Sequence, residues 1–211
     1  MRMRIAITLL LGLTCLYNSI NAAHRAPGFR QQQVSAAAQD LDRTIRLEIL
    51  VNAPAEKVWR AWTTRDGIKS FFAPDCNIDL RVLGKYDILF APSAPAGLRG
   101  AEGNLILAIQ EGKMLSFTWD APPNFPDIRK QRTSVVIRLV PLGQNRTKLV
   151  FRQSGWGEGE DWNKVHDYFV EAWGEVVLPY LKHSLEVGPI DWKNPPQNLE
   201  KAVSSRNIQN G

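Results

Sequence analysis

The chain has 211 residues, with 26 Lys and Arg against 21 Asp and Glu, so its formal net charge is +5. This length is enough for one domain with a buried core plus terminal segments. The charge excess is too small to indicate a nucleic-acid-binding protein.

Residues 1–23 have the features of a secretory signal peptide. Arg2 and Arg4 precede an apolar run over residues 5–16, and small residues follow at Ala22 and Ala23. The run is shorter than the roughly 20 residues that a spanning helix needs. We expect cleavage near Ala22 or Ala23, export to the periplasm or the cell exterior, and no stable membrane insertion afterwards. An uncleaved N-terminal anchor is the alternative.

Cleavage changes the charge and the cysteine count of the chain. It removes two Arg and leaves 24 basic against 21 acidic side chains, a net charge of +3. Cys15 leaves with the signal peptide, so Cys76 stays alone and no intrachain disulfide is predicted.

The folded domain is predicted over residues 43–187, after a flexible linker at 24–42 that has little periodic apolar content. Residues 44–51 alternate in polarity and predict a half-buried strand. Two short helices follow, because Pro54 suits a first helical position and Thr64 suits a cap. Their apolar sides carry, in turn, Val58, Trp59 and Trp62, and then Ile68, Phe71 and Phe72.

A period of two returns after residue 75 and predicts about six further antiparallel strands. Residues 120–130 hold three prolines and predict a loop. One face of each strand is apolar: Cys76, Ile78, Leu80 and Val82; Tyr86, Ile88 and Phe90; residues 103–109; Leu115, Phe117 and Trp119; Val135, Ile137 and Leu139; and Thr147, Leu149 and Phe151.

A long amphipathic helix is predicted over residues 161–186, with Asp161 as its N-cap. Pro179 removes the hydrogen bond to the Glu175 carbonyl and, with Gly174 nearby, predicts a kink. Residues 188–211 are predicted to be a tail on the surface. The apolar stripe of the helix holds Val165, Phe169, Trp173, Val176 and Tyr180, with Val177 beside them.

The element order is one strand, two short helices, about six strands and a long helix, which predicts an α+β fold. The first strand is expected to pair with a late one, so that a curved antiparallel sheet of six or seven strands wraps around the helix.

Several stretches resemble a known family. Residues 53–63, 111–119, 147–155 and 172–185 are similar to the SRPBCC (START-like) superfamily, and more narrowly to the AHSA1 family, related to the C-terminal domain of the Hsp90 ATPase activator. The resemblance covers roughly residues 43–186. It implies a helix-grip fold with a cavity between sheet and helix. It does not imply one reaction, because members include lipid carriers, polyketide cyclases and co-chaperone domains. The signal peptide would make this chain a secreted bacterial member.

Catalytic and metal motifs are weak in this sequence. His166 and His183 lie 17 positions apart on one helix, about 25 Å along its axis, too far to share a metal ion. No phosphate loop or nucleophile elbow is present, so no cofactor and no metal are predicted. The weak candidates for acid–base chemistry are His166, Tyr86 and Glu171, and a surface histidine is the simpler interpretation of His166.

The hypothesis we favour is non-enzymatic binding of a small hydrophobic or aromatic molecule in the cavity. An enzyme of the cyclase or hydrolase type using the same cavity, and a protein-interaction module related to Hsp90 co-activators, are the alternatives; the oligomeric state is left open. The expected cavity residues are Tyr86, Phe90, Phe117, Trp119, Phe151, Phe169 and Trp173. The same residues would instead be core if the cavity is filled.

Overall fold

A large antiparallel sheet holds most of the domain's strands in the computed structural model, which describes residues 43–204 and, for Val203 and Ser204, the backbone alone. Its strand order is β5-β6-β7-β8-β1-β9. The expected signal peptide and linker, and residues 205–211, lie outside the described residues. The strands are β1 (Ile45–Val51), β5 (Ile106–Gln110), β6 (Met114–Trp119), β7 (Thr133–Pro141), β8 (Thr147–Ser154) and β9 (Val203–Ser204).

The first strand pairs with a late one, as the sequence predicts. β1 runs antiparallel to β8, from Ile45 opposite Gln153 to Val51 opposite Thr147. A smaller sheet contains β2 (Asp75–Ile78), β3 (Tyr86–Leu89) and β4 (Gly100–Ala101). An isolated bridge between Lys85 and Leu105 connects its β3 side to the start of β5.

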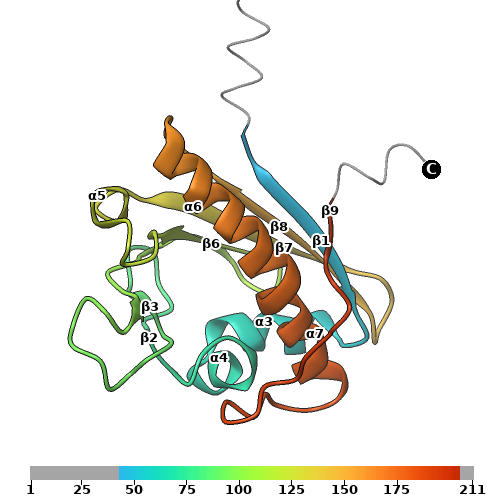
Figure 1. The fold of residues 1–211 in the computed structure, drawn as a ribbon. Helices are drawn as coiled ribbons and strands as arrows, with labels where there is room; N and C mark the ends of the chain where they lie inside the picture. Colours follow the sequence, from blue (N-terminus) through green and yellow to red (C-terminus); the bar gives the residue numbers. More distant parts are fainter. Residues whose placement is uncertain (1–42, 205–211) are drawn as a thin grey trace, which may run out of the picture. The chain divides into compact units, whose positions relative to one another are not determined.

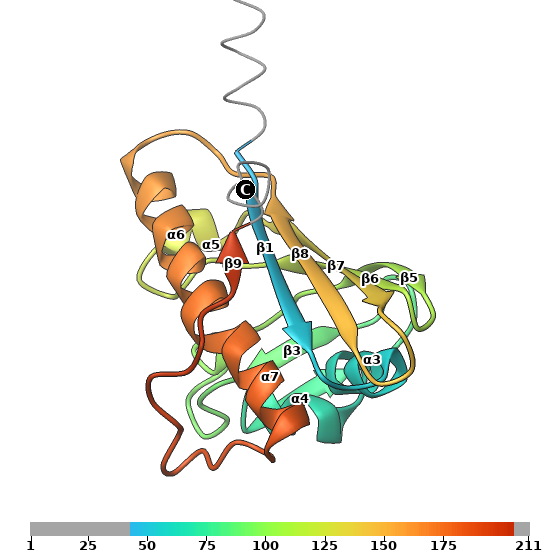
Figure 2. The ribbon, with the colours of Figure 1, turned by 90° about the vertical axis from the view of Figure 1, so that its right-hand side faces the viewer.

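The helices gather on one side of the large sheet (Figures 1 and 2). The long C-terminal helix crosses that face of the sheet, and α3 and α4 lie near its C-terminal end. This arrangement confirms the α+β helix-grip fold. The helical elements are α3 (Ala55–Thr63), α4 (Arg65–Phe71), α5 (Pro126–Arg129), α6 (Glu160–Glu171), the π-helical segment η1 (Ala172–Val177) and α7 (Leu178–Glu186). Among the described residues, no helix combines the length and apolar character needed to cross a membrane.

Alternation predicts the buried faces of β1, β7 and β8 correctly. The prediction that the strand after residue 75 continues to Val82 is wrong, because β2 ends at Ile78. Leu80 and Val82 are 43% and 53% exposed. The chain turns there instead, since the Gly84 N–H donates to the Arg81 carbonyl over 2.8 Å. Gly84 permits this turn, because a Cβ at its position would lie 2.1 Å from the Asp79 carbonyl oxygen.

The long helix begins at a different cap and changes register within its length. Gly159 is the N-cap, and the expected cap Asp161 lies inside the first turn. The Leu178 N–H donates to the carbonyl of Trp173, five residues earlier, as in a π-helix. The longer turn rotates the side chains of this part of the helix, so Val176 is exposed and the buried stripe continues at Leu178 and Leu181.

The tail after α7 lies on the surface and is tied to the domain up to Ser204. The Ile190 N–H donates to the Ser70 carbonyl, and Trp192 Nε1 donates to that of Lys69, both over 2.8 Å. Further on, the Ala202 N–H donates to the Gly174 carbonyl over 2.9 Å, and β9 pairs with β1. The tail thus forms an edge strand of the large sheet.

Candidate ligand pocket

A pocket of about 110 Å³ opens between the long helix and the end of β6. Its walls are predominantly apolar and aromatic, with one acidic and one basic side chain among them. The lining residues are Phe72, Phe90, Gly100, Ala101, Trp119, Asp120, Ala121, Pro122, Pro123, Arg129, Tyr168, Phe169, Ala172, Trp173 and Val177.

Three rings from three elements form the inner wall. Phe72 follows α4, Trp119 ends β6, and Trp173 lies in η1. The ring centroids of Trp119 and Trp173 are 5.2 Å apart. The ring centroid of Phe72 lies 5.7 Å from that of Trp119 and 5.6 Å from that of Trp173. These are ordinary aromatic packing distances. Phe90 and Tyr168, which are about half exposed, form the rim.

A chain of buried hydrogen bonds fixes the orientation of the Trp173 indole. Trp173 Nε1 donates to Gln153 Oε1 over 2.7 Å, and Gln153 Nε2 donates to Thr133 Oγ1 over 2.9 Å. Thr133 Oγ1 in turn donates to the Trp119 carbonyl over 3.1 Å. Because these polar groups are buried and satisfied, they hold both tryptophan-bearing elements in one arrangement.

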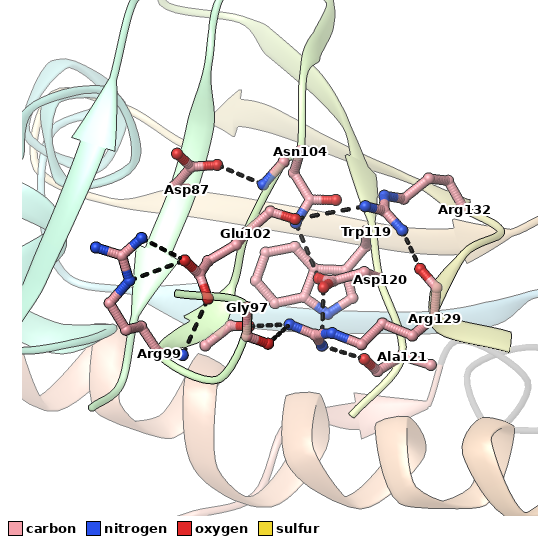
Figure 3. A network of polar contacts seen from close by, with 12 residues as sticks. Asp87, Gly97, Arg99, Glu102, Asn104, Trp119, Asp120, Ala121, Arg129 and Arg132 are labelled. Atoms are coloured by element: carbon pink, nitrogen blue, oxygen red, sulfur yellow. Dashed lines mark hydrogen bonds and ion pairs between the residues drawn. The ribbon is translucent and has the colours of Figure 1, made fainter. Parts of the chain in front are cut away.

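The polar side of the pocket is built around Asp120 and Arg129 (Figure 3). Arg129 Nη1 lies 2.8 Å from Asp120 Oδ2 and also donates to the Ala121 carbonyl. Arg129 Nη2 donates to the carbonyls of Gly97 and Gly100, over 3.3 and 2.5 Å. The guanidinium therefore ties the segment after β6 and the segment around β4 to α5, and these segments form one wall of the pocket.

Burial makes Asp120 an unusual carboxylate. Its side chain is 1% exposed, and burial raises its pKa against the opposing effects of the Asn104 hydrogen bond and the Arg129 and Arg132 charges. Asn104 Nδ2 donates to Oδ1 over 2.9 Å. Oδ2 accepts no hydrogen bond of good geometry although it is 2.8 Å from Arg129 Nη1. We regard that contact as an ion pair, because Coulomb attraction does not need a linear N–H···O angle.

Comparison with known proteins gives the family. The family model described as Activator of Hsp90 ATPase homolog 1-like protein (AHSA1) matches residues 52–186. The chain belongs to this family. No curated protein gives a match.

Solved structures agree with this assignment. Protein MLL2253 from Mesorhizobium loti is 26% identical with a TM-score of 0.51, over 68% of this chain and 94% of that chain. Protein SSP2350 from Staphylococcus saprophyticus is 16% identical with a TM-score of 0.51, over 69% and 93%. PFC0360w, an HSP90 activator from Plasmodium falciparum, is 20% identical with a TM-score of 0.50, over 68% and 94%. At these last two identities the likeness shows the fold alone.

The expected cavity residues of this AHSA1-family domain divide into two groups. Phe90, Trp119, Phe169 and Trp173 line the pocket. Tyr86, Phe117 and Phe151 do not: all three are fully buried in the core. Tyr86 packs on Phe117 at 4.4 Å, and Phe151 packs behind Trp173 at 4.6 Å. Alternation places a side chain on the inner face of the sheet, but it does not distinguish a packed position from a pocket wall.

The three acid–base candidates are not brought together. The Tyr86 hydroxyl donates to the Trp62 carbonyl over 2.9 Å, and burial, with a smaller effect of Cys76, raises its pKa well above the ordinary value. His166 Nδ1 lies 3.1 Å from Asp167 Oδ1, and its ring packs edge-on against Trp156. Glu171 is exposed, and none of the three lines this pocket.

Sequence reasoning missed Phe72, Asp120, Arg129 and Tyr168 as pocket residues. The pattern places Phe72 only on the apolar side of the second short helix. Asp120 and Arg129 fall in the stretch expected to be a loop, where Arg129 ends the short helix α5. Their pairing over nine positions follows no periodic pattern. Tyr168 lies on α6 outside the expected stripe. Within the described part of the chain, no three His, Cys, Asp or Glu side chains come together as a metal-binding group.

Proposed function

We propose that this protein binds a small uncharged apolar or aromatic molecule in the pocket, without chemically changing it. The observation that carries the proposal is the arrangement of Phe72, Trp119 and Trp173 around a space that opens between half-exposed rim rings. An apolar, ring-lined concavity with few polar groups is the usual form of a small-molecule site.

The size of the pocket limits the ligand. An apolar cavity of roughly 150 Å³ accommodates benzene, so a pocket of about 110 Å³ has room for no more than one small ring or the end of a longer molecule. Since the rim is open, the remainder of a longer ligand would extend past Phe90 and Tyr168.

The charges at the wall favour a neutral ligand. Asp120 and Arg129 neutralise each other, and the Arg129 donors are directed at the carbonyls of Ala121, Gly97 and Gly100. An acidic ligand would have to compete with these internal contacts, and a cationic ligand would have to displace Arg129 from Asp120.

The test is a titration with toluene, followed by tryptophan emission. Because Trp119 and Trp173 line the pocket, ligand entry should change the emission. Ala172→Leu should abolish the response by filling the space. Val176→Leu is the matched control: it places a leucine in the same helical segment, at an exposed position that does not line the pocket.

Binding by the parent and by Val176→Leu, with loss in a folded Ala172→Leu variant, supports the proposal. Absence of any response in the parent, to toluene and to other single-ring compounds such as phenol and indole, would contradict it. An equal response in Ala172→Leu would place the binding elsewhere on the molecule.

A further inference from the structure

Pro179 leaves one carbonyl of the long helix without a donor from within the helix. In η1 the Leu178 N–H donates to the Trp173 carbonyl, five residues back. The next bond in this pattern would join the N–H of residue 179 to the carbonyl of Gly174. Proline has no N–H, so this bond is missing. Because Gly174 is buried, its carbonyl needs a partner from elsewhere in the chain.

The C-terminal tail supplies that partner. The Ala202 N–H donates to the Gly174 carbonyl over 2.9 Å. The next two residues, 203 and 204, pair with β1 as β9. Figure 2 shows β9 between β1 and the long helix. The tail therefore bridges the edge of the sheet and the irregular turn of the helix.

The same irregular turn forms part of the pocket. Ala172, Trp173 and Val177 belong to η1 and line the pocket. If η1 became α-helical, each N–H would donate to the carbonyl four residues earlier instead of five. The side chains of η1 would then rotate relative to Leu178. The hydrogen bond to Gly174 thus acts on the element that sets one pocket wall.

We propose that residues 200–204 are a strap that holds η1 in its π-helical form and thereby positions the pocket wall for the ligand. The second part of this proposal, the positioning of the wall for the ligand, rests on the proposed function. Ala202 acts as a positioning residue through its backbone N–H. Strap docking and ligand binding then favour each other, because linkage between two sites is reciprocal.

The contacts of the strap suit a reversible element. Lys201 pairs with Glu175 over 2.5 Å, and Lys182 lies 3.6 Å from Glu200; Lys201, Glu175 and Glu200 are largely exposed. Exposed ion pairs hold weakly, and β9 is two residues long. The strap also lies outside residues 52–186, which match the family.

The test removes the Ala202 donor and then restores a donor inside the helix. Ala202→Pro deletes the N–H, while Ala202→Ser keeps it and serves as the matched control. Pro179→Ala returns an N–H that can reach the Gly174 carbonyl. The variants are compared in the full chain by toluene affinity and by amide hydrogen exchange of Val176, Val177 and Leu178.

Ala202→Pro should weaken toluene binding about fivefold or more, at the lower end of couplings between sites, and should speed exchange in η1. Ala202→Ser should behave as the parent. In the Pro179→Ala background Ala202→Pro should have little further effect, which makes the pair of changes non-additive.

Unchanged exchange in η1 in Ala202→Pro overturns the strap, whether or not toluene binds. Faster exchange with unchanged toluene affinity overturns its positioning of the pocket. If the parent binds no toluene, the proposed function fails, and the exchange data with the non-additivity still decide whether the strap holds η1.

Discussion

Trp173 illustrates how one residue combines a core role with a pocket role. Its ring contacts Phe72, Trp119, Phe151 and Phe169 at centroid distances from 4.6 to 6.5 Å, and it is 1% exposed. A tryptophan whose ring faces mainly a cavity is only partly packed and costs little stability when it is removed. Trp173 is different, because the pocket touches one part of a ring that is otherwise enclosed.

Trp173→Ala should therefore destabilise the domain by about 3–5 kcal/mol, the usual cost of deleting a large buried aromatic side chain. The loss also leaves Gln153 Oε1 without its indole donor. Urea unfolding at equilibrium measures the change in the free energy of unfolding. A cost below about 1 kcal/mol, a typical value for one hydrogen bond, would show that the ring is loosely packed.

Asp120 and Asp75 should give opposite dependences of stability on pH. Burial raises the pKa of Asp120 above its ordinary value of 3.8. The folded state then holds this proton more tightly than the unfolded state, so Asp120 removes stability as pH rises from 3.8 through the raised pKa. The Cys76 N–H, opposed by burial and helped by Arg65, lowers the pKa of Asp75. Its stabilising contribution is present above 3.8 and is lost as pH falls through the lowered pKa.

Urea unfolding of Asp120→Asn and Asp75→Asn, from about pH 3 to pH 7 across the carboxyl range, tests these signs. In the parent, Asp120 lowers the stability as pH rises, and Asp120→Asn should lack this contribution. In the parent, the stability from Asp75 is lost as pH falls, and Asp75→Asn should lack this loss. Profiles that change in the same direction for both variants would contradict the assigned causes.

At the scale of elements, the sequence predicts well where one period is maintained, as in β1, where Ile45, Leu47, Ile49 and Val51 are all buried. It fails where the backbone changes period. Pro179 signals an irregularity, but nothing local selects a π-helical segment over a kink, because that choice depends on Ala202, 28 positions away from Gly174 in the chain. The same limit applies to Asp120 and Arg129, whose contact depends on how the connection between β6 and β7, which contains α5, folds back on itself.

Gly174 offers a direct test of the geometry of η1. A Cβ added at this position would meet the Leu47 methyl groups at 3.8 and 3.9 Å, ordinary contact distances. Because Gly is a poor helix former and the added methyl group would make only ordinary contacts, Gly174→Ala should raise the free energy of unfolding by about 0.5–1 kcal/mol. Thermal and urea unfolding measure this. A destabilised variant would mean that β1 lies closer to η1 than the structure shows.

At the scale of the whole molecule, export is a separate prediction from the fold. The basic start, the short apolar run and the small residues at Ala22 and Ala23 predict that the mature chain begins near Ala23 or His24. N-terminal sequencing of protein from its native host measures this. Recovery of cytosolic protein that still begins at Met1 would contradict export.

The central claim is that an uncharged ring occupies the pocket, and a crystal structure of the full protein exposed to toluene tests it most directly. We expect electron density for one ring in contact with Phe72, Trp119 and Trp173, and little movement of these side chains, because the Gln153 hydrogen bond already fixes the indole. Density at that position should be absent in Ala172→Leu and present in Val176→Leu. An empty pocket in the parent at saturating toluene, with the three rings unchanged, would contradict the claim.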